Sequence, residues 1–107
     1  MALPPEKRET ARWLDALEEE DVQFLRRFLL SSGSLKALAE EYGVSYPTLR
    51  GRLDRLIAKV RAAEDPRITD PFERKLRMLV ADARLPSPLA RELLEAHRAA
   101  LPRRREP

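Results

Sequence analysis

Three arginines within six residues are the side chains of this sequence best placed to act together. Arg50, Arg52 and Arg55 follow directly on a proline and a threonine in the stretch SYPTLRGRLDRLI. A guanidinium group presents a rigid fork of N–H donors, which matches two acceptors on a phosphate or on the edge of a guanine. Arginines at this spacing therefore favour binding to nucleic acid, although each one taken singly is also typical of a solvated helix surface.

The element that must position these arginines is a helix. Its leucine spacing predicts a helix from Tyr46 to about Ala62. One narrow sector of this helix is apolar and holds it on a core, through Leu49, Leu53, Leu56 and Val60. The opposite side carries Pro47, Thr48, Gly51, Asp54 and Arg55, with Arg50 and Arg52 on either flank.

Gly51 is unexpected near the centre of that polar side. A glycine in a helix interior costs about 1 kcal/mol relative to alanine. Either its missing side chain lets the helix backbone approach a nucleic-acid groove closely, or it admits a neighbouring side chain of the protein itself. Tyr46 leaves two similar readings open, since it either packs on the neighbouring helix or touches DNA.

A short glycine-containing turn joins this helix to an earlier one, expected from Leu35 to Tyr42. Ser34 is suited to cap the first helix and Ser45 the second. Gly43 lies where a positive φ is tolerated by glycine alone, and we expect Val44 to fill the angle between the helices. This pattern predicts a helix-turn-helix motif, with an ordinary helical hairpin as the alternative. The predicted DNA-binding residues are Ser45, Tyr46, Pro47, Thr48, Arg50, Gly51, Arg52 and Arg55.

The whole chain reads as all-α, because Leu, Ala, Glu, Arg and Lys dominate and strand-like runs are absent. We expect a helix-turn-helix domain over residues 1–62, in which a segment from Glu6 to Leu17 comes first and Trp13, Phe24 and Phe28 belong to the core. Residues 63–69 read as a linker, 70–101 as a C-terminal helical hairpin, and 102–107 as a basic tail that either clamps phosphate or only solubilises the end.

The hairpin has clear start signals. Asp70 is expected to cap its first helix, with Pro71 in the first turn and Glu73 completing a capping box. Ser87 and Pro88 start the second helix. Its apolar faces are too small to form a core alone, so they must pack on the N-terminal unit or on a second copy of the chain. We expect a homodimer through this hairpin, because one recognition helix binds DNA weakly.

Charge and composition exclude several classes of function. The formal net charge is +3, and residues 33–61 carry six basic and three acidic side chains, whereas residues 1–32 carry five basic and seven acidic. There is no cysteine, and His97 is the only histidine, expected as a packed or surface residue. No membrane-spanning run and no signal peptide are apparent, so we expect a cytoplasmic protein. No catalytic residue, metal ligand or cofactor is predicted.

The stretch LxxLAxxYGVSYPTLRxRLDxLI, with FLRRFLLSSGSLK before it, resembles an uncharacterised prokaryotic family of small helix-turn-helix proteins, a family defined as a domain of unknown function. More loosely, the motif spacing resembles region 4 of sigma-70 factors. The first resemblance implies DNA binding and places Ser45, Tyr46, Thr48, Arg50 and Arg52 at recognition-helix positions. Promoter melting is not implied, because the rest of a sigma factor is missing.

These observations favour a sequence-specific transcriptional regulator that binds double-stranded DNA as a homodimer. The alternative is a protein-interaction module of the transcription machinery, which would dock on RNA polymerase or another regulator through the acidic N-terminal segment and the hairpin. An enzyme is disfavoured, because the sequence has no glycine-rich phosphate loop and no carboxylates at catalytic spacing.

Overall fold

A computed structural model describes residues 12–102, and this part of the chain is helical with no strand. The helices are α2 (Arg12–Asp15), α3 (Glu19–Leu30), α4 (Leu35–Tyr42), α5 (Tyr46–Glu64), α6 (Pro71–Ala81) and α7 (Ser87–Ala100). The all-α class predicted from the sequence is confirmed. The expected segment from Glu6 to Leu17 and the expected tail at 102–107 lie partly outside the described residues.

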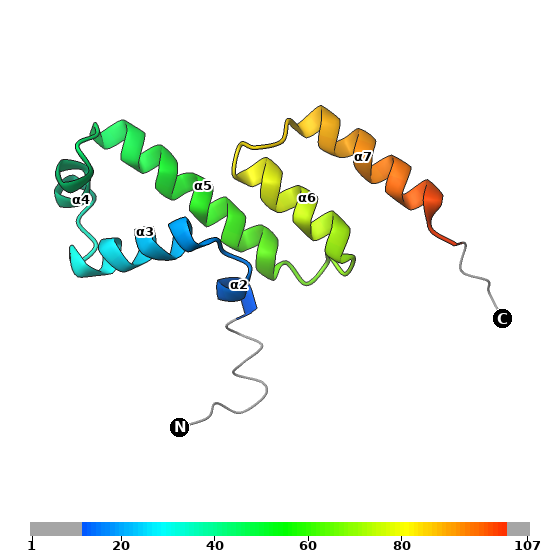
Figure 1. The fold of residues 1–107 in the computed structure, drawn as a ribbon, viewed down its shortest axis with the longest axis horizontal. Helices are drawn as coiled ribbons and strands as arrows, with labels where there is room; N and C mark the ends of the chain where they lie inside the picture. Colours follow the sequence, from blue (N-terminus) through cyan, green and yellow to red (C-terminus); the bar gives the residue numbers. More distant parts are fainter. Residues whose placement is uncertain (1–11, 103–107) are drawn as a thin grey trace, which may run out of the picture.

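The long helix α5 organises the molecule. Helices α2, α4 and α6 pack against it, α3 packs on α4, and α7 packs on α6. Figure 1 shows α5, α6 and α7 running side by side in alternating directions, with α3 and α4 gathered around the first half of α5. No helix in residues 12–102 is long and apolar enough to cross a membrane.

The core lies between α3, α4 and α5. Its fully buried members are Phe24, Leu38, Ala39, Leu49 and Leu56, and Leu35, Leu53, Val60 and Phe28 pack partly buried against them. The leucine sector predicted for α5 is therefore confirmed. Two expectations were wrong in detail. Trp13 is only half-buried, and Val44 is 40% exposed, so its side chain does not fill the interhelical angle.

The start of α6 agrees with the sequence in its cap but not in its capping box. The Asp70 carboxylate accepts a hydrogen bond from the Phe72 backbone N–H at 2.9 Å, and this bond lowers the pKa of Asp70. The predicted capping box is wrong, because Glu73 is drawn away from the cap. Its carboxylate instead binds Arg77 on α6 and Arg98 on α7, each at 3.0 Å, and so ties the two hairpin helices together.

The segment expected as a linker is anchored on both sides. Ala63 and Ile68 are buried, at 2% and 4% exposure. Arg74 of α6 donates hydrogen bonds to the backbone carbonyls of Ala63, Asp65 and Ile68. Arg74 thereby supplies donors to C=O groups at the end of α5, which have no partner within the helix, and to the segment that follows it. The hairpin therefore packs directly on the recognition helix.

Candidate nucleic-acid interface

The turn between α4 and α5 has the geometry that the sequence predicted. Gly43 adopts φ 69°, a left-handed conformation that other residues rarely adopt. The backbone N–H of Val44 donates to the carbonyl of Ala39 at 3.0 Å, which closes the end of α4. A Cβ at Gly43 would meet no atom within 4 Å, so the requirement for glycine comes from the backbone angle and not from crowding.

The first turn of α5 is capped as predicted. The Ser45 hydroxyl oxygen accepts from the Thr48 backbone N–H at 3.3 Å, and the two hydroxyl groups lie 2.9 Å apart. No acidic side chain occupies the first turn of α5, in contrast to α3. The positive end of the helix dipole is therefore not neutralised by its own first turn, and backbone N–H groups there can receive a phosphate.

Most of the predicted site residues are exposed along the first half of α5, and we call this set the recognition surface. It consists of the exposed Ser45, Tyr46, Pro47, Thr48, Arg50 and Arg55 and the partly exposed Gly51. Tyr46 is 51% exposed, so the structure does not place it in the core. A Cβ on Gly51 would meet only the Arg55 side chain, at 3.8 Å, so no other element of the chain fills the space left by the glycine.

Arg50 is paired within its own helix. Its guanidinium lies 3.2 Å from the carboxylate of Asp54, one turn further along, and both side chains are about half exposed. This pair contributes little to stability because it is exposed. Its consequence is for binding, since Asp54 reduces the positive charge of the recognition surface and orients Arg50 along the helix.

Arg52 lies apart from the other predicted contacts. Its guanidinium stacks over the ring of Phe24 at 4.7 Å and faces the ring of Tyr42 at 5.5 Å, and its side chain is half-buried. These two rings are themselves stacked at 6.2 Å. The Arg52 side chain thus packs on α3 and α4 and holds the recognition helix on its core. It does not contribute to the recognition surface around Gly51.

The sequence reasoning missed a buried lysine in this unit. Lys59 is 3% exposed, and its ammonium lies 2.6 Å from Asp21 on α3 and 3.4 Å from Asp82 after α6. Burial lowers the pKa of Lys59, but the hydrogen bond to Asp21 and the charges of both carboxylates outweigh it and raise the pKa overall. Its position between Leu56 and Ala63, both buried and at helical spacing, was the available signal.

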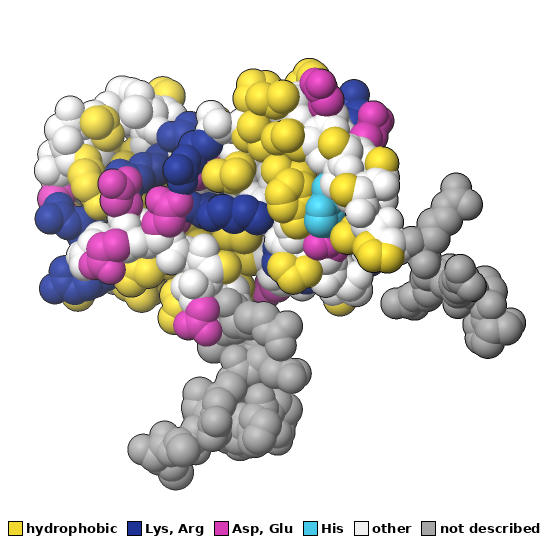
Figure 2. All heavy atoms as spheres, turned by 45° about the vertical axis from the view of Figure 1, so that its right-hand side comes forward, with side chains coloured by type: hydrophobic (Ala, Val, Ile, Leu, Met, Phe, Trp, Pro, Cys, Tyr) yellow, Lys and Arg dark blue, Asp and Glu magenta, His cyan; other side chains and the backbone are white. Residues whose placement is uncertain are grey.

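On one face of the molecule, charged and apolar side chains are largely separated. Figure 2 shows arginine, lysine and acidic side chains concentrated on the part formed by α3 to α5, and hydrophobic side chains gathered over α6 and α7 around His97. Next to the recognition surface, Arg52 and Arg55 border a polar cleft that Glu18, Glu20 and Asp82 also line. The basic residues of α5 therefore face acidic groups of their own chain.

Helix α4, the glycine turn and α5 form a helix-turn-helix motif on a core shared with α3. This arrangement places the protein in the helix-turn-helix class. Comparison with known families agrees. Residues 17–63 match the family model described as "Domain of unknown function (DUF2089)-HTH". This match supports the resemblance to an uncharacterised helix-turn-helix family. No curated protein and no solved structure matches the chain.

Proposed function

We propose that this protein is a sequence-specific DNA-binding transcriptional regulator that inserts the first half of α5 into the major groove. The observation that carries the proposal is the open recognition surface. Gly51 faces no side chain except Arg55, and Tyr46, Thr48 and Arg50 are exposed around it. The helix-turn-helix match supports the same function, because in such motifs the second helix reads base edges from its N-terminal half.

Each side chain has a role that follows from its place. Arg50 and Arg55 supply guanidinium groups to guanine or phosphate, and Asp54 holds Arg50 in position or accepts from cytosine. Ser45 and Thr48 present the helix N-terminus to a phosphate. We further propose that the regulator acts in the cytoplasm as a homodimer joined through α6 and α7.

The experiment is duplex binding at several salt concentrations. A duplex selected from random sequences should bind the wild-type protein, with an affinity that falls steeply as salt rises. Arg50→Ala with Arg55→Ala should weaken binding by roughly tenfold or more and flatten the salt dependence. Lys36→Ala is the comparison variant, because it removes one exposed cation from α4, the helix that crosses the DNA backbone in such motifs, and it should weaken binding less. If no duplex binds even at low salt, the proposal is wrong.

A second candidate function has one observation in its favour. Leu29 and Leu30, at the end of α3, are 73% and 71% exposed. Adjacent leucines this exposed favour a protein contact, such as docking on RNA polymerase or another regulator. A pull-down from nuclease-treated extract with wild-type protein and a Leu29→Ser, Leu30→Ser variant tests it. Recovery of a partner by wild type alone would support this candidate.

A further inference from the structure

The last helix of the protein is the least buried of the long helices. No residue of α7 is buried, although it carries three leucines, and its main packing partner within residues 12–102 is α6. Leu89 and Leu93 are 44% and 39% exposed, and Phe72 of α6 is 40% exposed. A helix of this length is marginally stable in water without burial of an apolar face. The hairpin is therefore incomplete as a single subunit.

The exposed apolar residues occupy one side of the hairpin, which we call the hairpin face. It comprises Phe72 and Lys75 of α6 together with Leu89, Glu92 and Leu93 of α7. The ring of Phe72 lies 4.2 Å from that of His97, one turn after Leu93, so the two helices contribute to one continuous surface. Figure 2 shows hydrophobic side chains around His97 on this side.

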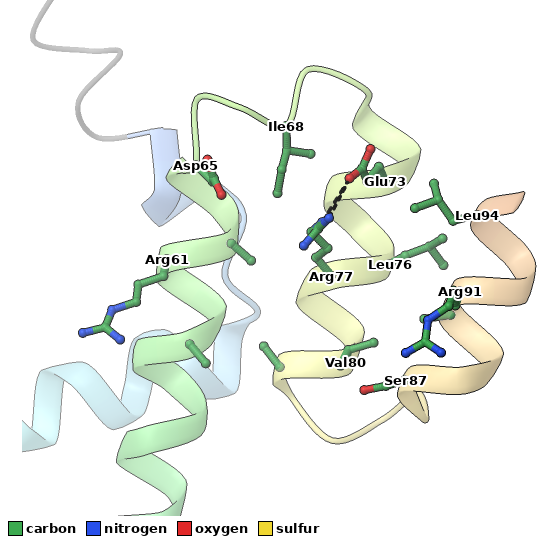
Figure 3. A pocket seen from close by; sticks show the side chains of 14 residues that line it. Arg61, Asp65, Ile68, Glu73, Leu76, Arg77, Val80, Ser87, Arg91 and Leu94 are labelled. Atoms are coloured by element: carbon green, nitrogen blue, oxygen red, sulfur yellow. Dashed lines mark hydrogen bonds and ion pairs between the residues drawn. The ribbon is translucent and has the colours of Figure 1, made fainter. Parts of the chain in front are cut away.

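The other side of the hairpin carries a groove of about 430 Å³. Figure 3 shows Leu76 and Val80 of α6 directed toward α7 and Leu94 on the facing helix, with Arg77 directed from α6 toward α5 and Arg91 on α7. Both helices thus contribute arginine on this side. Within residues 12–102, Arg77 is paired with Glu73 and Asp65 with Arg67, which leaves Arg61 and Arg91 as the unpaired cations of the groove. Two copies facing each other through the groove would therefore oppose these like charges.

Charge on the hairpin face is arranged differently. Lys75 lies on α6, one turn after Phe72, whereas Glu92 lies on the outer part of α7, and both are exposed. Neither forms an ion pair with any residue in 12–102. A two-fold axis parallel to the hairpin sets α6 of one copy opposite α7 of the other. That operation places Lys75 beside Glu92 of the second copy, twice in each dimer.

We infer that the hairpin face is the interface of a homodimer, in which α6 and α7 of two copies form a four-helix arrangement with α6 opposite α7. Apolar side chains from both copies cover one another, and the Lys75–Glu92 pairs fix the pairing of helices. This inference rests on the homodimer of the proposed function but not on DNA binding.

The dimer leaves both recognition surfaces uncovered. Along α5, Gly51 continues at helical spacing into Ala58 and Ala62, which line the groove, so the recognition surface and the groove lie on the same side of each subunit. The hairpin face lies on the opposite side, and the two recognition surfaces of a dimer therefore point away from each other. We expect each subunit to bind its own short duplex, and this arrangement departs from the sequence-based expectation that two recognition helices share one site.

The test is sedimentation equilibrium on the full chain with a charge exchange. Wild type should form a dimer. Leu93→Glu should weaken the dimer by roughly a hundredfold or more, because it puts a carboxylate into an apolar interface. Lys75→Glu and Glu92→Lys should each weaken it about tenfold, and the two changes together should restore affinity to within about threefold of wild type. Circular dichroism checks that each variant remains helical.

Arg91→Glu is the matched control, because it alters charge on the groove side of the same helix. It should leave the dimer unchanged. The inference is overturned if wild type is monomeric, if Arg91→Glu breaks the dimer, or if the charge exchange fails to restore it. A monomer that captures a different helical protein through Leu93 would equally overturn it.

Duplex titration keeps failure of this inference distinct from failure of the proposed function. If DNA binding is correct, monomeric Leu93→Glu protein still binds one short duplex. Wild-type dimer that binds one duplex in place of two would overturn the outward-facing arrangement while leaving both dimerisation and DNA binding in place.

Discussion

The two halves of this protein bury the apolar faces of their helices to different extents. In the helix-turn-helix half, Leu38 and Leu49 are almost wholly buried, and the exposed leucines Leu29 and Leu30 lie at the end of α3. In the hairpin half, Leu89 and Leu93 of α7 stay about two-fifths exposed. Both halves have amphipathic helices of similar composition, so the difference lies in what packs on the apolar side. The first half completes its core from its own chain, whereas the second leaves part of the apolar side of α7 exposed to solvent.

The largest expected effect tests this contrast directly. Leu38→Ala should destabilise the subunit by about 3 kcal/mol, because it leaves a cavity in a closed core. Leu93→Ala should cost about 1 kcal/mol or less in the monomer, because this side chain is partly in water already. Urea unfolding, at protein concentrations too low for a dimer to form, measures both losses of stability. Equal losses would show that the hairpin is packed as closely as the core.

The contact between the two halves, in which Lys59 lies between Asp21 and Asp82, should be almost as sensitive to substitution. Lys59→Met removes the ammonium that lies between Asp21 and Asp82 and leaves the two carboxylates without their shared partner. We expect a loss of about 3 kcal/mol in unfolding free energy. Lys36→Met, on an exposed face of α4, is the matched control and should change stability by less than about 0.5 kcal/mol.

The pH dependence of the unfolding free energy gives a second measurement of the contact between Lys59 and the two carboxylates. Because the pKa of Lys59 is raised in the folded protein, its stabilisation is present below the ordinary lysine value of 10.5 and is lost as pH rises through the folded value. Wild type should therefore lose stability at alkaline pH more steeply than Lys59→Met does. Parallel curves for the two proteins would contradict this assignment.

The sequence predicted the elements and the core better than it predicted individual side-chain partners. Apolar spacing and caps such as Ser34 and Ser45 determine helices locally, so the bounds of α4 and α5 followed from them. Partners such as Lys59 with Asp21, or Arg74 with the end of α5, join residues far apart in sequence. Local spacing can indicate that Lys59 is buried, but it does not identify the partners of Lys59 or Arg74, and only the packing of α3 and α6 on α5 reveals them.

Arg52 illustrates the same limit within the candidate site. Its helical angle put it on the flank of the recognition surface, but the aromatic rings of Phe24 and Tyr42 attract its guanidinium to the core side. Arg52→Ala should therefore cost about 1 kcal/mol in stability through lost cation–π and packing contacts. The matched Arg50→Ala should leave stability within about 0.5 kcal/mol and weaken duplex binding more.

The two measurements separate a structural arginine from a binding one. Thermal unfolding reports the first effect, and duplex affinity measured well below the unfolding temperature reports the second. If Arg52→Ala weakens duplex binding as much as Arg50→Ala at unchanged stability, then Arg52 leaves the aromatic rings when DNA binds, and the static arrangement does not describe the complex.

The smallest expected effect on stability is an increase, and it comes from a substitution at Gly51. It tests at one residue whether α5 is shaped for stability or for binding. Gly51→Ala should stabilise the subunit by up to about 1 kcal/mol, because alanine favours helix and the added Cβ meets only the flexible Arg55 side chain at 3.8 Å. The same methyl group would stand between the α5 backbone and the DNA groove, so duplex affinity should fall. Ala62→Gly, on the same side of α5 near its end, is the control and should lower stability without altering affinity. Should Gly51→Ala raise stability and leave duplex affinity untouched, close approach of the α5 backbone to DNA would be excluded.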